Sequence, residues 1–197
     1  MYSEDDLITA LHTLRQGGVI LYPTDTIWGI GCDALNDEAV RRIYQIKQRD
    51  DSKALILLLD GQESLQRYVI LSPAQSDALQ SHVHVADSSL QERPTTVIYP
   101  SVHGLPSSLK AADGSVGIRL TNEPFTKALC RALGHPLVST SANRSGMPSP
   151  DHFGEMDPTL LHEVDYVCRY RQDDTTPASP SRIVRLMPDG QVTILRS

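Results

Sequence analysis

The segment that most constrains the fold is Ala54–Leu59, with the sequence ALILLL. It is short, apolar on both faces, and bounded by Lys53 on one side and Asp60-Gly61 on the other. A strand that is apolar on both faces must be covered on both faces, which is typical of a central strand in a helix-covered sheet. The chain therefore needs further strands beside this one and helices packed around them.

The rest of the chain supplies both kinds of element. Ser3 and Asp6 resemble a helix-capping pair, and Leu7, Leu11 and Leu14 then share one helical face that Gly17-Gly18 terminates. Further helices are predicted from Asn36, over Glu63–Tyr68 and Ala74–Ser81, and from Asn122 and Pro124 to Gly134. Further strands are predicted at Val19–Tyr22, Thr95–Tyr99, Val116–Leu120, Pro136–Thr140, Tyr166–Arg169, Ile183–Leu186 and Val192–Leu195.

Pro188-Asp189-Gly190 joins the last two predicted strands and is typical of a hairpin. Crossover helices combined with a terminal hairpin predict an α/β fold with a twisted mixed sheet. No linker, repeat or low-complexity tract interrupts the sequence, so we expect a single domain over residues 1–197.

Composition limits the class of protein. The net charge of -6, from 18 Lys and Arg against 24 Asp and Glu, argues against a surface that grips nucleic acid everywhere. A focused basic pocket stays compatible with it. Three widely spaced cysteines form no CxxC or zinc pattern, and no run approaches the roughly 18 apolar residues of a membrane span. With an acidic, helix-like start, these features predict a cytoplasmic protein with free thiols and no membrane partner.

The segment Gly17–Asp33 has two interpretations. The strand Val19–Tyr22 ends at Pro23, and small polar residues, Thr24-Asp25-Thr26, follow before Trp28 and two glycines. Polar groups and glycines at the end of a buried strand are how a ligand pocket is built. Ordinary turn chemistry explains the same residues equally well, so this segment alone leaves both interpretations open.

Cations and hydroxyls gather at other strand ends. Lys47, Arg49 and Lys53 lie within seven positions before the central strand, although a basic helix terminus is common in itself. Further along the chain come Arg119, Ser139, Ser141, Asn143 and the step Pro180-Ser181-Arg182. Together these side chains suit a phosphate-bearing ligand. The HExxH, GxSxG, Walker A and GxGxxG motifs are absent from the sequence.

Six segments, taken in order and spacing, resemble the YrdC-like threonylcarbamoyl-AMP synthases. They are PTDTIWGIG, KQRDDSKALILLL, RPTTVIYP, GIRL, STSANRSGMPSP and PSRIV, and they span about Gly17 to Val184. The resemblance implies a YrdC/RibB-like twisted sheet around a concave electropositive cavity. It also implies a nucleotidyltransferase, L-threonylcarbamoyladenylate synthase, which converts L-threonine, bicarbonate or CO2, and ATP into threonylcarbamoyl-AMP and pyrophosphate. Partner proteins then use that product to modify tRNA, and a direct tRNA contact is left open.

The resemblance also implies roles for individual residues. Those expected to bind threonine are Thr26, Leu58, Arg119, Ser139 and Ser181. Those expected to bind ATP are Arg49, Lys53, Ser115, Ser141, Asn143 and Ser149. Lys47 and Arg49 are expected to stabilise charge, with no protein nucleophile, because attack of a carbamate on the α-phosphate needs only that the anions be held and neutralised. Mg²⁺ is expected on ATP, held by phosphates and water, with no metal site of the protein itself.

The sequence departs from the family pattern in places. The KxRP element is Lys47-Gln48-Arg49-Asp50, the RxP element is Arg119-Leu120-Thr121, the usual Tyr or Phe is Trp28, and of WPGP only Arg93-Pro94 remains. The first two departures leave the named side chains in place. Because no extra C-terminal domain follows, the chain resembles the short form.

Three alternative functions are compared with this prediction by their sequence features. The first is a non-catalytic RNA-binding protein that uses the same basic cavity. The second is an adenylate-forming enzyme acting on free carbamate, which the single short domain disfavours. The third is a paralogue without the SAN element, disfavoured by Ser141-Ala142-Asn143.

Overall fold

A computed structural model describes residues 1–48, 55–83 and 93–197 of the chain. Its strands form one mixed sheet in the order β7-β1-β2-β6-β3-β5-β4-β8-β9. The strands are β1 Ile20–Tyr22, β2 Gly29–Gly31, β3 Ile56–Leu59, β4 Thr95–Tyr99, β5 Val116–Leu120, β6 Leu137–Ser141, β7 Tyr166–Val167, β8 Arg182–Leu186 and β9 Val192–Arg196. The pairs β1–β7, β3–β5 and β4–β8 are parallel and the other neighbours antiparallel, which confirms the predicted mixed sheet.

Several helices begin or end at capping residues that the sequence predicts, whereas the helix predicted over Glu63–Tyr68 already ends at Leu65. They are α1 Glu4–Arg15, α2 Asp37–Lys47, α3 Gln62–Leu65, α4 Pro73–Val83, α5 Pro124–Leu133 and α6 Pro158–Glu163. The Ser3 hydroxyl accepts a hydrogen bond from Asp6 N at 3.1 Å, and Asn36 caps α2 in the same way. Gly134 ends α5 with a φ of 78°, the left-handed region that glycine adopts without strain. The sequence did not predict α6 or the 3₁₀ turns Ser107–Leu109 and Phe153–Glu155.

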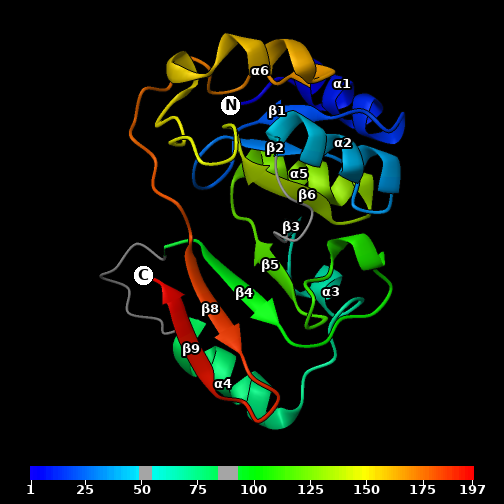
Figure 1. The fold of residues 1–197 in the computed structure, drawn as a ribbon, viewed down its shortest axis with the longest axis vertical. Coiled ribbons are helices and arrows are strands. Elements are labelled where there is room, and N and C mark those ends of the chain that lie inside the picture. The colour runs from blue at the N-terminus through cyan, green and yellow to red at the C-terminus, as the bar shows by residue number, and fades with distance from the viewer. Residues whose placement is uncertain (49–54, 84–92) are drawn as a thin grey trace.

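The central strand is shorter in the structure than in the prediction. It begins at Ile56, while Ala54 lies outside the described residues. Its central position is confirmed, because β3 pairs with β6 on one side and β5 on the other. Figure 1 shows the sheet extending from β1 and β2, near α1 and α6, to β8 and β9 beside α4. No helix among the described residues combines the length and apolar character needed to cross a membrane.

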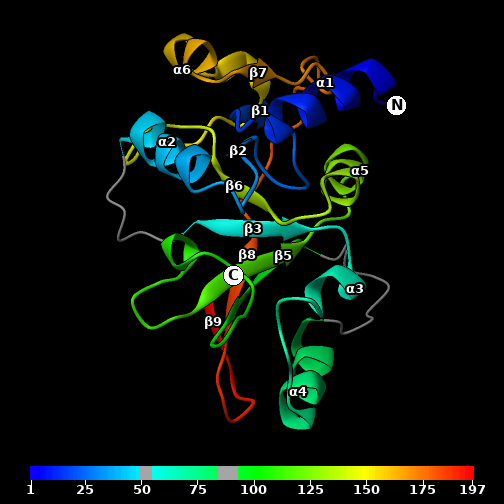
Figure 2. The same cartoon turned by 90° about the vertical axis from the view of Figure 1, so that its right-hand side faces the viewer.

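Helices cover both faces of the sheet (Figures 1 and 2). On one face, α1 and α5 pack through Leu14, Phe125 and Leu129 onto Ile20, Tyr22, Leu58 and Leu137. On the opposite face, Val40 and Ile43 of α2 join a larger core that contains Leu57, Ile118 and Val138. The two-faced burial of β3 is therefore the reason that its sequence is apolar throughout.

The face under α1 and α5 continues beyond these helices. Strand pairing places Ser139 and Gly117 on either side of Ile56, and Arg119 beside Leu58. Because residues two apart on a strand share a face, this surface carries Ile56, Gly117, Arg119 and Ser139. In this region the face carries a glycine and two polar residues beside Ile56, instead of the apolar side chains that α1 and α5 cover.

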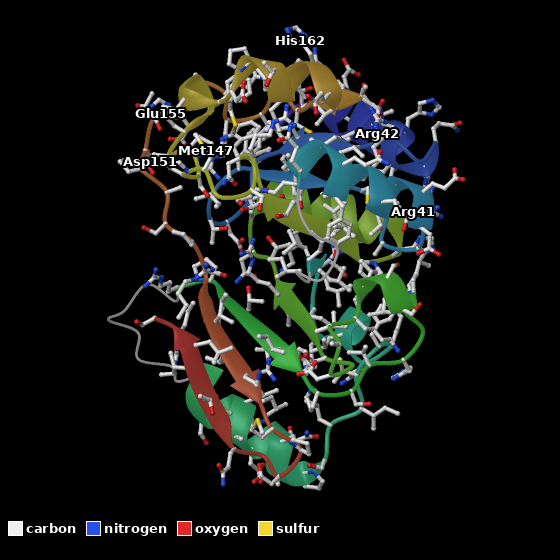
Figure 3. All side chains as sticks on the ribbon, in the orientation of Figure 1. Arg41, Arg42, Met147, Asp151, Glu155 and His162 are labelled. Atoms are coloured by element: carbon white, nitrogen blue, oxygen red, sulfur yellow. The ribbon has the colours of Figure 1, made fainter. Side chains whose placement is uncertain are left out.

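The segment between β6 and α6 lies on the outside of the molecule. Met147, Asp151 and Glu155 lie along it, and His162 follows on α6 (Figure 3). Met147 is 63% exposed. At its start, Ser145 N donates to Lys47 O, which ties the segment to the end of α2.

Candidate functional site

A cavity of about 280 Å³ opens on the sheet face beyond α5. Six residues expected to bind ligand line it, namely Thr26, Arg119, Ser139, Ser141, Ser149 and Ser181. They come from the loop after β1, from β5, from β6 and the segment after it, and from the approach to β8. The pairing of β3 with β5 and β6 brings these distant parts of the sequence together.

Missing side chains give the cavity its depth. A Cβ on Gly29 would lie 3.2 Å from Ser139 Oγ and 3.2 Å from Thr24 Cγ2. A Cβ on Gly117 would lie 3.3 Å from Ile56 Cγ2. Gly29 and Ser139 both line the cavity, so a side chain at Gly29 would reduce the space beside Ser139.

The loop between β1 and β2 has a defined hydrogen-bond direction. The Thr24 hydroxyl donates to Ile27 O at 2.7 Å, which uses its one proton because a carbonyl only accepts. The Thr26 hydroxyl, 3.0 Å from Thr24 Oγ1, must therefore donate to it. Thr26 Oγ1 is left with its lone pairs, so it offers the cavity an acceptor for a ligand N–H or O–H.

Two residues far away in the sequence anchor this loop. The Thr126 hydroxyl of α5 donates to Pro23 O at 2.7 Å. The Arg171 guanidinium donates to Thr24 O at 3.0 Å and to Asp174 Oδ2 at 2.9 Å. The polar end of the predicted turn is therefore a fixed part of the cavity wall.

Arg119 and Arg196 bring positive charge to the cavity. The Arg119 side chain is 3% exposed, and its Nε has no hydrogen-bond partner among the described residues. Arg196 donates to Ser181 O at 2.8 Å and to Ser181 Oγ at 3.2 Å. Burial lowers the Arg196 pKa from its ordinary value, and the nearby charges of Arg93 and Arg119 lower it further. A site with two close, partly desolvated arginines suits an anion.

Tyr22 is a buried neutral group next to Gly29, which lines the cavity. Its hydroxyl donates to Val138 O at 3.3 Å. Burial raises the Tyr22 pKa far above its usual range, and a hydrogen bond with Ser139 only partly opposes this shift. Burial also raises the pKa of the three free thiols, Cys32, Cys130 and Cys168, so they are unreactive core residues.

Of the predicted ligand residues that the structure describes, Leu58, Ser115 and Asn143 do not line this cavity. Leu58 shares a sheet face with Arg119, but α5 covers that part of the face, and Leu58 is fully buried against Phe125 and Leu129. Ser115 precedes β5, at the opposite end from Arg119, and its hydroxyl donates to Asp113 Oδ1 at 2.6 Å. The side chains of Leu58 and Ser115 therefore lie outside the lining of the small cavity, and their roles in binding ligand stay predictions.

Lys47 and Asn143 stand behind the cavity wall. Lys47 is 2% exposed, and its Nζ donates to Ser141 O, to Asn143 Oδ1 at 3.2 Å and to Ser141 Oγ at 3.3 Å. Asn143 in turn donates to Arg144 O and Met147 O. Their contacts shape the segment that carries Ser141 and Ser149. Arg49 and Lys53 lie outside the described residues.

Thr96 and Arg196 line the cavity although the sequence gives no signal for either side chain. Thr24 also lines it, and it belongs to the polar cluster Thr24-Asp25-Thr26 for which a pocket was one of the two interpretations. Arg196 reaches it because β9 folds back on β8, which in turn pairs with β4. The predicted hairpin at Pro188-Asp189-Gly190 contained this information, but only the register of the pairing places the side chain. Over residues 1–48, 55–83 and 93–197, no three His, Cys, Asp or Glu side chains gather in a way that could hold a metal ion.

Comparison with known proteins gives a consistent result. The family model Sua5_yciO_yrdC, described as "Telomere recombination", matches residues 12–197. A protein of Xanthomonas campestris pv. campestris, named threonylcarbamoyl-AMP synthase, is 36% identical over 162 residues, which cover 82% of this chain and 84% of that protein.

Solved structures share the fold. E. coli YciO superposes with a TM-score of 0.81 at 23% identity, covering 99% of this chain and 90% of that one. P. abyssi Sua5 complexed with L-threonine superposes with a TM-score of 0.78 at 21% identity, covering 98% of this chain and 54% of that one. The sequence match along nearly the whole chain shows that this protein belongs to the Sua5/YciO/YrdC family.

Proposed function

We propose that this protein is an L-threonylcarbamoyladenylate synthase, a nucleotidyltransferase that makes threonylcarbamoyl-AMP and pyrophosphate from L-threonine, bicarbonate or CO2, and ATP. One observation carries the proposal: a buried arginine with an unpaired Nε and a threonine hydroxyl left as an acceptor line the same small cavity. An α-amino acid presents the complementary pair, a carboxylate and an N–H donor. The name of the Xanthomonas relative and the L-threonine bound to P. abyssi Sua5 support this choice of substrate.

In the proposed complex, Arg119 binds the substrate carboxylate through charge-assisted hydrogen bonds. Thr26 accepts a hydrogen bond from the substrate, and the Ser139 and Ser181 hydroxyls line the cavity on either side. The amino group, once deprotonated, attacks CO2 and forms a carbamate. Binding between a fixed cation and a fixed acceptor sets the direction in which that amino group points.

The second half of the proposed reaction joins two anions. A carbamate oxygen attacks the α-phosphorus of ATP, and the bond to pyrophosphate breaks. The residues that line the cavity towards the segment after β6, Ser141 and Ser149, would donate to phosphate, and Arg196 would neutralise developing charge. Mg²⁺ would enter on the triphosphate, bound by phosphate oxygens and water. Lys47 would act through the segment that it holds.

Further elements of the proposal come from the family resemblance. The product would supply proteins that modify tRNA, and the reaction would take place in the cytoplasm. The alternative of a non-catalytic RNA-binding protein gains no support from the named relatives, since the Xanthomonas protein is named as a synthase.

The test is pyrophosphate release from Mg-ATP and bicarbonate, measured with and without L-threonine. We expect release that depends on L-threonine, and a loss of at least about a hundredfold in kcat/KM for threonine in R119Q, because a charged hydrogen bond to the substrate is lost. The matched control is R41Q, since Arg41 is an exposed arginine on α2 (Figure 3). Release without L-threonine, or an R119Q variant as active as R41Q, would contradict the proposal.

A further inference from the structure

Asp25 and Arg119 form a buried ion pair between two cavities. Arg119 Nη2 lies 3.0 Å from Asp25 Oδ1, and the two side chains are 3% and 11% exposed. Arg119 lines the small cavity, whereas Asp25 lines a cavity of about 1350 Å³. The larger cavity lies against the opposite face of the sheet, since Val97 and Ile118 line it. The pair therefore stands at the boundary between the two faces.

The backbone on both sides of Asp25 is fixed. Thr126 holds Pro23 O, Arg171 holds Thr24 O, and Thr26 N donates to Thr24 Oγ1 at 3.0 Å. The carboxylate at position 25 is thus attached to a loop that cannot move without breaking these bonds. Asp25 Oδ1 has no hydrogen-bond partner among the described residues, so its interaction with Arg119 is one of charge.

The same loop also carries the acceptor of the small cavity. Thr26 follows Asp25 directly, so one rigid turn holds both the anion that attracts Arg119 and the hydroxyl that faces the ligand. Arg119 lines the small cavity, and its buried Nε has no hydrogen-bond partner among the described residues. The Asp25–Arg119 contact therefore links the arginine of the small cavity to the turn that carries Thr26.

We propose that Asp25 is a positioning residue for amino-acid binding: its charge holds the Arg119 guanidinium at a fixed separation from Thr26. The proposal rests on the proposed function, in which Arg119 binds the carboxylate of L-threonine. It assigns no contact between Asp25 and the substrate, because Asp25 lines the opposite cavity.

The experiment measures KM for L-threonine and for ATP in D25N. Because a buried arginine that loses its counter-charge also loses its orientation, KM for L-threonine should rise at least about tenfold. KM for ATP should stay within about twofold. The matched control is D60N: Asp60 lines the same large cavity and pairs with an arginine, Arg131, at 3.2 Å, but not with Arg119. Its two KM values should be those of the unmodified protein.

A double-mutant cycle shows whether Asp25 acts through Arg119. In the R119Q background, D25N should cause no further loss of kcat/KM for L-threonine, measured by the release of pyrophosphate. Additive losses would overturn the proposal, as would a folded D25N protein that binds L-threonine equally well or more tightly. Tighter binding would mean that Asp25 only competes with the ligand for positive charge.

A failure of D25N to fold and a failure of the proposed function can be told apart. If D25N fails to fold, D25E keeps the charge but moves the carboxylate by one methylene, and it should still raise KM for L-threonine; unchanged binding in D25E would overturn the proposal. If R119Q binds L-threonine normally, the proposed function is at fault, independently of Asp25.

Discussion

Arg119 and Glu123 lie four residues apart, and burial affects them differently. Arg119 is buried next to an opposite charge, which balances the cost of removing it from water. Glu123 is 5% exposed and caps α5 by accepting from Thr126 N at 2.7 Å, while its Oε1 has no partner in the described part of the chain. Burial raises the Glu123 pKa, and the hydrogen bonds from Thr126 and Phe125 oppose this only in part. The charged form of Glu123 is therefore a source of instability.

This difference predicts that E123Q is more stable than the unmodified protein at neutral pH. The glutamine oxygen can still accept from Thr126 N, and the desolvated charge is gone. Because the folded-state pKa is raised, the native protein is most favoured when Glu123 is protonated, and this stability is lost as the pH rises above the ordinary value of 4.5. Thermal unfolding should show a higher Tm for E123Q at pH 7 and no gain at pH 4.

The exposed residue Glu63 supplies the control for this prediction. E63Q should leave the Tm unchanged at both values of pH. An E123Q variant that is less stable than E63Q at pH 7 would show that the Glu123 charge is favourable where it lies.

At the scale of elements, the close packing of β2 against β6 requires glycine at position 31. A Cβ on Gly31 would lie 2.2 Å from Val138 O and 2.8 Å from Tyr22 Cε1. The carbonyl belongs to β6, so relief of this clash would require two paired strands to separate. We predict that G31A lowers the free energy of unfolding by about 3 kcal/mol or more, measured by urea denaturation.

Gly61 provides the comparison for G31A. Its φ of 167° is extended backbone that any residue adopts, and a Cβ there would meet nothing within 4 Å. G61A should change the stability by less than about 1 kcal/mol. Equal effects of the two substitutions would mean that the close approach of β2 and β6 is not required.

The elements also show what the sequence could predict. Caps such as Ser3, Asn36 and Gly134 are local chemistry, so the ends of their helices were predictable. The three-residue strand β2 is too short for a period to be recognised, and its place in the sheet depends on distant partners. Helix α6 has only six residues and little apolar pattern of its own.

The site was predictable only in part for the same reason. Residues at strand ends could be expected to meet, and six of them do line one cavity. Leu58 illustrates the limit. It pairs with Arg119 in the sheet, but α5 covers its side chain. No local sequence pattern indicates how far a helix extends over a sheet. Arg196 illustrates the converse, since long-range pairing brings an ordinary strand residue to the cavity.

On the scale of the whole molecule, exposed carboxylates connect its outer segments. Hydrogen bonds from the Ser115 hydroxyl and backbone, helped by Arg185, lower the Asp113 pKa to about 2. Those from the Thr176 hydroxyl and backbone, helped by Arg171, lower the Asp174 pKa to about 2. Asp174 thereby supports the arginine that anchors Thr24 O.

These two shifts predict the acid sensitivity of the fold. Since the folded-state pKa values are depressed from 3.8, the stability that they contribute is complete above about pH 4 and is lost as the pH falls towards 2. The urea midpoint of the D113N/D174N double variant should therefore decline less steeply between pH 4 and pH 2 than that of the unmodified protein. The exposed residue Asp151 provides the control, D151N. Parallel declines in all three proteins would contradict the assignment.

The central claim concerns the small cavity: a cation and an acceptor there bind an amino acid. Calorimetric titration of L-threonine into the unmodified protein, R119Q and T26V tests it most directly. We predict one binding site in the unmodified protein, no measurable binding to R119Q, and affinity reduced roughly three- to tenfold in T26V, because one neutral hydrogen bond is lost. Binding of L-threonine to R119Q with the affinity of the unmodified protein would contradict the claim.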